Sequence, residues 1–116
     1  KAAVSHYTRM AGIELGPHSI RVNTISPGAI ATPIFWGGSA RANTLTDEDN
    51  ERKMQKLQAN LSRATPLPRS GLSKDIAEAA LFLASDAGSY VNCHDLVVDG
   101  GRTSMFMEPP PVPGSS

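Results

Sequence analysis

The residues of this chain that are best suited to hold a ligand lie in one turn, from Pro27 to Thr32. A segment with apolar side chains at Ile20, Val22 and Ile25 precedes the turn and predicts a β-strand. Pro27 fixes its own backbone and Gly28 offers a bare, conformationally free one, so the chain can leave the sheet sharply and approach a ligand closely. Thr32 adds a hydroxyl. Because ligands of open α/β sheets bind where strands end, the turn predicts one wall of a ligand crevice; an ordinary Pro-Gly turn is the alternative.

Three further segments frame this turn. Residues 1–15 have the apolar spacing of a helix that stops at Gly16-Pro17, residues 75–84 predict a largely apolar helix, and residues 96–101 read Leu-Val-Val-Asp-Gly-Gly. Each motif alone is common, but the ordered set closely resembles the C-terminal half of the short-chain dehydrogenase/reductase family. The resemblance covers residues 1 to 102. It implies an α/β fold, the C-terminal half of a Rossmann-like, doubly wound parallel sheet.

The expected elements are too few to close a core. Apolar spacing and capping signals predict helices at residues 1–15, 47 to about 60 or 63, and 75–84, with strands at 20–25 and 96–98. Thr46 is the expected N-cap of the second helix, since three acidic residues follow it. Residues 33–44 are expected to be irregular. Because two strands leave edges and apolar faces uncovered, we expect this fold to be incomplete as an isolated domain, with residues 75–84 buried against the sheet and against another subunit.

The resemblance also implies roles for single residues. Lys1 stands at the position of the family's catalytic lysine, followed by Ala-Ala-Val, and the catalytic tyrosine would lie four residues earlier. An adjacent ammonium favours the phenolate form of a tyrosine, whose ordinary pKa is about 10. Without the resemblance, Lys1 would be an ordinary surface lysine. The family's nicotinamide loop matches Pro27, Gly28, Ile30 and Thr32, so the implied cofactor is NAD or NADP.

The segment after this loop, residues 33–63, occupies the position of the family's substrate lid. Ile34, Phe35 and Trp36 could line an apolar pocket, with Gly37-Gly38 as a hinge. Alternatively, these side chains only pack the lid onto the body of the protein. An apolar lid favours a cyclic or hydrophobic alcohol or ketone as the small-molecule partner.

Two features near the C-terminus are interpreted as structural. Asp99-Gly100-Gly101 predicts a tight turn. Cys93 stands where the family usually has glycine, and if that position needs a positive φ, the cysteine is strained. The three histidines and the single cysteine share no metal-ligand spacing, so no metal site is expected.

Composition narrows the function class. Eleven basic and eleven acidic residues balance without a basic block, which argues against a nucleic-acid partner, and no apolar run is long enough for a membrane span. A cytoplasmic protein is expected, with residues 1–107 as one portion of a domain and residues 108–116 as a flexible, Pro-rich tail. A start at Lys1 instead of methionine favours truncation or processing.

The resemblance thus predicts part of an NAD(P)-dependent oxidoreductase that transfers a hydride between a nicotinamide and an alcohol or ketone, homo-oligomeric in its full-length form. The family's phosphate-binding loop and its catalytic tyrosine and serine are missing from the sequence. We therefore expect the chain alone to be inactive. A truncated, non-catalytic oligomerisation module and a small-molecule binding module are the alternatives.

Overall fold

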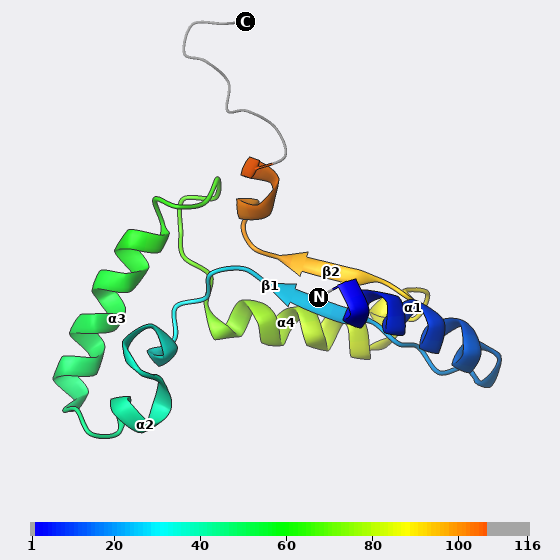
Figure 1. The fold of residues 1–116 in the computed structure, drawn as a ribbon, viewed down its shortest axis with the longest axis horizontal. Helices are drawn as coiled ribbons and strands as arrows, with labels where there is room; N and C mark the ends of the chain where they lie inside the picture. Colours follow the sequence, from blue (N-terminus) through cyan, green and yellow to red (C-terminus); the bar gives the residue numbers. More distant parts are fainter. Residues whose placement is uncertain (1, 107–116) are drawn as a thin grey trace, which may run out of the picture. The chain divides into compact units, whose positions relative to one another are not determined.

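The computed structural model describes residues 2–106, which form two compact units (Figure 1). Unit 1 contains residues 2–27 and 74–98, and unit 2 contains residues 28–73 and 99–106. Each unit joins two segments that are distant in sequence.

Unit 1 carries a parallel sheet of two strands, as predicted. Its elements are α1 (Ala2–Leu15), η1 (Gly16–His18), β1 (Thr24–Pro27), α4 (Ser73–Ala84, whose first residue belongs to unit 2), η3 (Asp86–Gly88) and β2 (Asp95–Val98). The strands lie side by side, in register from Thr24 opposite Asp95 to Pro27 opposite Val98 (Figure 1). The hydroxyl of Ser26 on β1 also donates to Asp95 Oδ1 at 2.7 Å, which ties the two strands together through side chains.

The first strand does not lie where the sequence predicts it. The predicted strand covers residues 20–25, whereas β1 begins only at Thr24. Upstream, side-chain amides replace part of the ladder: Val22 N–H donates to Asn92 Oδ1 and His94 N–H donates to Asn23 Oδ1, each at 3.0 Å. These side-chain bonds interrupt the regular backbone pairing, so the strand starts later than its apolar residues suggest.

Pro27 is the last residue of β1, and the chain leaves the sheet directly after it, as predicted. Thr24 N–H donates to His94 O at 2.9 Å, so the backbone groups of Thr24 face β2. Alternate residues of a parallel strand point these groups to opposite edges, which places those of Ile25 and Pro27 on the other edge. No strand of the described residues pairs with that edge, so the missing N–H of Pro27 removes no ladder bond.

Unit 2 is mainly helical. Its elements are η2 (Pro33–Trp36), α2 (Gly38–Ala42), α3 (Asp47–Leu61) and η4 (Arg102–Phe106). Residues 33–44 are therefore more regular than predicted. Pro33 occupies the first turn of η2, where a fixed φ and a missing N–H are tolerated, and Gly37 (φ 108°) separates η2 from α2.

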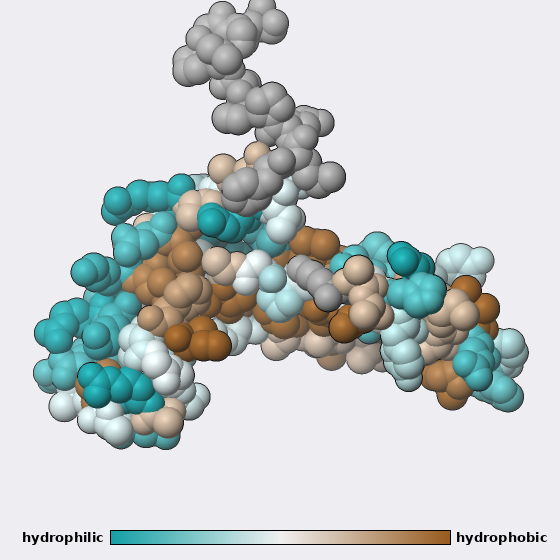
Figure 2. Space-filling model, viewed as in Figure 1, coloured by the Kyte–Doolittle hydropathy of each residue, from teal (hydrophilic) through white to brown (hydrophobic). Residues whose placement is uncertain are grey.

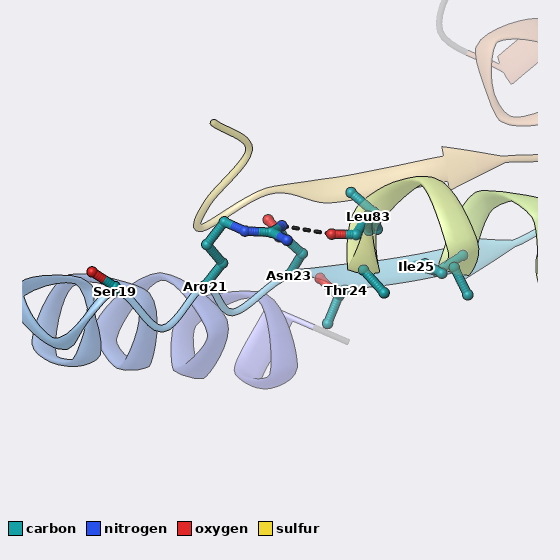
Figure 3. A pocket seen from close by; sticks show the side chains of 8 residues that line it. Ser19, Arg21, Asn23, Thr24, Ile25 and Leu83 are labelled. Atoms are coloured by element: carbon teal, nitrogen blue, oxygen red, sulfur yellow. Dashed lines mark hydrogen bonds between the residues drawn. The ribbon is translucent and has the colours of Figure 1, made fainter. Parts of the chain in front are cut away.

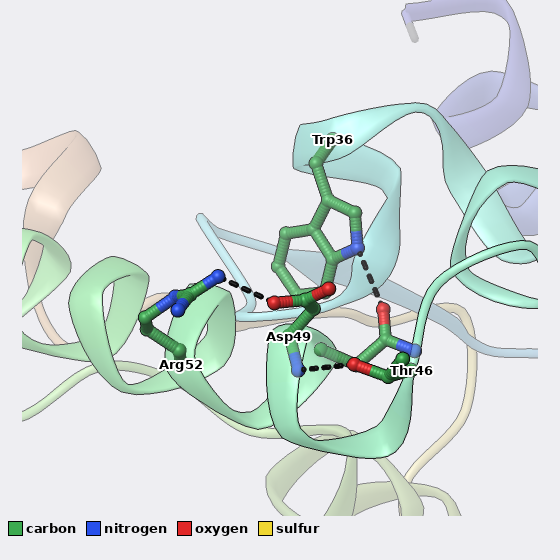
Figure 4. Close-up of polar contacts among 5 residues, drawn as sticks. Trp36, Thr46, Asp49 and Arg52 are labelled. Carbon is green, nitrogen blue, oxygen red and sulfur yellow. Dashed lines mark hydrogen bonds and ion pairs between the residues drawn. The ribbon is translucent and has the colours of Figure 1, made fainter.

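The predicted start of α3 is confirmed. Thr46 has an extended backbone and its hydroxyl accepts a hydrogen bond from Asp49 N–H at 3.1 Å. Asp49 also pairs with Arg52 one turn along the helix (Figure 4). Local sequence signals thus determine where this helix begins.

Little apolar surface is buried. Among the described residues, the buried apolar side chains are Ala31 and Leu83 alone. Large apolar side chains remain exposed on α1 and α4, namely Val4, Tyr7, Met10, Ile13, Leu81 and Phe82, and Figure 2 shows apolar residues at the surface. Within this chain, Leu83 is the one buried residue of α4, since a two-stranded sheet offers too little surface to cover the helix; burial of α4 against another subunit stays a prediction.

Candidate cofactor and substrate site

The turn after β1 is built around a close backbone approach. A Cβ atom at Gly28 would lie 2.6 Å from Asp99 Cβ and 2.8 Å from Asp99 Cα, so only glycine fits beside Asp99. Gly28 does not have a positive φ, so the turn does not require glycine for its conformational freedom. The lack of a side chain at Gly28 does allow a close approach, as predicted, but the group that approaches is Asp99 within unit 2.

Ile30 and Thr32 are positioned by a single bridge to a distant segment. Ile30 pairs with Gly71 in an isolated parallel bridge, and Ala31 N–H donates to Gly71 O at 2.9 Å. Ala31 is buried between the two predicted site residues. Thr32 has an extended backbone at the start of η2 and its side chain makes no capping hydrogen bond, so its hydroxyl is not committed to the helix.

The predicted site residues are divided between the units. Gly28, Ile30, Thr32 and the lid residues belong to unit 2, and Pro27 ends the strand of unit 1. Lys1, the predicted catalytic residue, lies outside the described residues, as does the predicted tail at 108–116.

The three predicted lid residues differ in their surroundings. The side chains of Ile34 and Phe35 are 74% and 52% exposed. Trp36 is half-buried, and its Nε1–H donates to Asn50 Oδ1 at 3.3 Å (Figure 4). Asn50 Nδ2 in turn donates to Ala42 O at 2.8 Å. Asn50 is not predictable as a site residue from the sequence, because its one signal is that asparagine is a poor helix former near the start of a helix.

The turn at residues 99–101 is confirmed. Gly100 and Gly101 have φ values of 64° and 93°. The Asp99 carboxylate accepts hydrogen bonds from Gly101 N–H and Thr103 N–H, both at 2.8 Å, and from the Thr103 hydroxyl. The Thr103 hydroxyl, followed by the two N–H groups, lowers the pKa of Asp99 because these bonds favour the ionised form. Asp99 therefore organises the turn and packs against Gly28.

The positive φ on which the expected strain at Cys93 depends is present, with a value of 59°. The thiol lies 3.5 Å from Arg9 O. The preceding Asn92 donates from Nδ2 to Gly12 O at 3.0 Å and accepts at Oδ1 from Cys93 N–H at 3.0 Å. The turn before β2 is thus fastened to α1 within unit 1.

A hollow of about 560 Å³ opens in unit 1 at the amino end of β1, not at its carboxyl end (Figure 3). It is lined by Ser19, Arg21, Asn23, Thr24, Ile25, Ala80, Leu83 and Ala84. Arg21 Nη1 donates to Leu83 O at 2.6 Å, so the guanidinium is engaged in joining α4 to the segment before β1. Thr24 Oγ1 is buried with no hydrogen-bond partner.

Two observations apply to residues 2–106 only. They contain no group of three or more histidine, cysteine, aspartate or glutamate side chains arranged to hold a metal ion. They also contain no helix with the length and hydropathy that crossing a membrane requires.

The two-stranded parallel sheet and its helices form an α/β fragment that matches Rossmann-fold structures. The family model described as Enoyl-(Acyl carrier protein) reductase matches residues 1–103, and the chain belongs to the short-chain dehydrogenase/reductase family.

Three relatives place the chain within that family. It is 42% identical over 101 residues to 7alpha-hydroxysteroid dehydrogenase of Escherichia coli (strain K12), covering 87% of this chain and 34% of that protein. The structure of a short-chain type dehydrogenase/reductase from Mycobacterium ulcerans is 36% identical with a TM-score of 0.64, covering 89% of this chain and 33% of that one. A 3-oxoacyl-[acyl-carrier protein] reductase with bound NAD from Brucella melitensis is 34% identical with a TM-score of 0.60, covering 86% and 30%. The chain spans about a third of the length of the curated relatives it matches.

Proposed function

We propose that the polypeptide carrying this chain is an NAD(P)-dependent oxidoreductase that transfers a hydride between a nicotinamide and an alcohol or ketone. The observation that carries this proposal is the family match over residues 1–103, which includes the loop from Pro27 to Thr32. A similar structure holds NAD, which supports the choice of cofactor class.

Within this proposal, residues 28–32 hold the nicotinamide. The backbone at Ile30 is fixed by its bridge to Gly71, and the Thr32 hydroxyl makes no capping hydrogen bond. A fixed backbone and a hydroxyl can therefore both bind a polar substituent of the ring. These groups fit a carboxamide, which needs both donors and acceptors. When bound, the nicotinamide supplies the hydride chemistry.

Lys1 is the proposed catalytic cation. Its ammonium would stabilise the phenolate of a tyrosine four residues earlier, so that this tyrosine gives or takes the substrate proton near neutral pH. The sequence before Lys1 in the gene tests this role. Tyrosine at that position supports the proposed chemistry, and any residue without an ionisable hydroxyl contradicts it.

The proposed substrate is an apolar or cyclic alcohol or ketone. Ile34 and Phe35 present exposed apolar side chains directly after the proposed nicotinamide loop. A relative at 42% identity is a hydroxysteroid dehydrogenase. Turnover of a cyclic secondary alcohol should exceed that of a polar sugar, and the reverse preference would contradict this substrate class.

The cofactor site is tested by Thr32→Val in the natural polypeptide, expressed with any residues that precede Lys1. Losing a hydrogen bond to the carboxamide should weaken NAD(P)H binding about threefold to tenfold in a fluorescence titration. Thr44→Val is the matched control, because within residues 2–106 the Thr44 hydroxyl donates to the nearby Arg41 O alone, at 2.6 Å. Equal cofactor affinity in both variants and the parent protein would exclude Thr32 from the site.

A homo-oligomer is proposed for the whole enzyme, and an association module is the second candidate function for the chain. Both are supported by the exposed apolar side chains of α1: Val4, Tyr7, Met10 and Ile13. Mass measurement in solution tests them. A folded monomer of 12.3 kDa, formed by the chain alone, would contradict the module.

A further inference from the structure

The side chain of Asn50 joins three elements of unit 2. It projects from the first turns of α3, where Asn50 N–H donates to Thr46 O at 3.0 Å. Its Oδ1 accepts from Trp36 Nε1–H on η2 at 3.3 Å, as the dashed line from Trp36 shows (Figure 4). Its Nδ2 donates to Ala42 O, the last residue of α2, at 2.8 Å. One amide therefore links η2, α2 and α3.

Asparagine suits this position because its side chain offers an acceptor and a donor at the same time. Aspartate would keep the acceptor for Trp36 but lose the donor for Ala42. Alanine would lose both. Asparagine is also a poor residue for a helix, so its presence in α3 is not explained by helix stability.

Two glycines interrupt the segment that Asn50 links. Gly37 and Gly38, with φ values of 108° and 82°, separate Trp36 from α2. A chain that passes through two such glycines can adopt many alternative paths. The bond from Trp36 to Asn50 therefore restrains η2 relative to α3, and η2 is the element that carries Ile34 and Phe35.

We infer that Asn50 is a positioning residue of the substrate lid: by holding Trp36 it directs Ile34 and Phe35 toward an apolar, ring-containing alcohol or ketone. Trp36 is thereby the anchor of the lid and not one of its substrate contacts. This inference rests on the proposed oxidoreductase function. It separates the roles of three neighbouring apolar residues that sequence alone leaves together.

The test compares Asn50→Ala, Asn50→Asp and Trp36→Phe in the natural polypeptide, with any residues that precede Lys1. Asn50→Ala should raise KM for a cyclic apolar alcohol about threefold to tenfold while kcat and KM for NAD(P)H stay nearly constant. Trp36→Phe should have a similar effect, and the double variant should be no worse than either single one, because both remove the same bond. Asn50→Asp should fall between Asn50→Ala and the parent protein.

Asp49→Asn is the matched control. It changes the neighbouring residue and removes the ion pair with Arg52, yet leaves the Trp36–Asn50 bond intact. Hydrogen exchange measured by mass spectrometry on peptides from residues 33–45 gives a second readout. Exchange there should rise in Asn50→Ala and not in Asp49→Asn.

The outcomes separate the two proposals. An inactive polypeptide in which exchange still rises would refute the oxidoreductase function while the restraint by Asn50 stands. An active enzyme in which Asn50→Ala and Asp49→Asn shift substrate KM equally, or in which exchange at residues 33–45 is unchanged, would overturn the role of Asn50.

Discussion

The contact between Gly12 and the turn before β2 supports a quantitative prediction for Gly12→Ala. A Cβ atom at Gly12 would overlap Cys93 Sγ and lie 2.8 Å from Asn92 Oδ1. Neither neighbour can move freely. Asn92 makes hydrogen bonds to Gly12 O, Val22 N–H and Cys93 N–H, each at 3.0 Å, and Cys93 is held at a φ of 59°.

The magnitude follows from these contacts. Inserting a methyl group into a packed contact costs about 1 to 3 kcal/mol, and loss of one Asn92 hydrogen bond adds about 0.5 to 1.5 kcal/mol. We therefore expect Gly12→Ala to lower the free energy of unfolding by about 2 to 4 kcal/mol. Urea denaturation of the natural polypeptide, followed by circular dichroism, measures this change.

A second substitution tests the reasoning. Cys93→Gly removes the overlapping thiol and relieves the strain of a positive φ, so it should rescue much of the loss caused by Gly12→Ala, with a coupling energy above about 1 kcal/mol. Gly16→Ala is the control, because a Cβ there has its nearest neighbour at 3.7 Å. If the effects of Gly12→Ala and Cys93→Gly are additive, the steric explanation is refuted.

Two other predictions concern Asp99. Gly28→Ala should destabilise the protein by about 1 to 3 kcal/mol because the new methyl group meets the Asp99 backbone, and an unfolding midpoint equal to that of the parent protein would contradict the close approach. Asp99 itself has a pKa below its ordinary value of 3.8, so its ionised form stabilises the fold above that pH, and the contribution disappears as pH falls through the lowered pKa. The stability difference between the parent protein and Asp99→Asn, measured by denaturation at several pH values, should therefore shrink on acidification; a difference independent of pH would refute this linkage.

Features set by nearby residues were predictable from the sequence. The end of α1 at Leu15 follows from Gly16-Pro17, and the start of α3 follows from Thr46 and the acidic residues after it. The turn at residues 99–101 was likewise predictable from residue type. In each case the deciding interaction spans only a few residues.

Features set by distant residues were not predictable. The start of β1 depends on amide bonds between residues about seventy positions apart, such as Val22 with Asn92. The bare backbone of Gly28 depends on Asp99, and the role of Asn50 depends on Trp36. Apolar spacing carries no record of such pairs, which explains why these contacts were not predicted; the ligand crevice at residues 27–32 stays a prediction.

The unpaired edge of β1 has a consequence for the production of this chain. Within residues 2–106, β2 is the sole neighbour of β1, so the N–H and C=O groups of Ile25 point to an open margin. An unpaired edge can form hydrogen bonds with another extended peptide, including the same segment of a second copy, and such pairing leads to aggregation. Co-expression with a polypeptide that pairs with this edge should give unaggregated protein, whereas expression of the chain alone should give inclusion bodies.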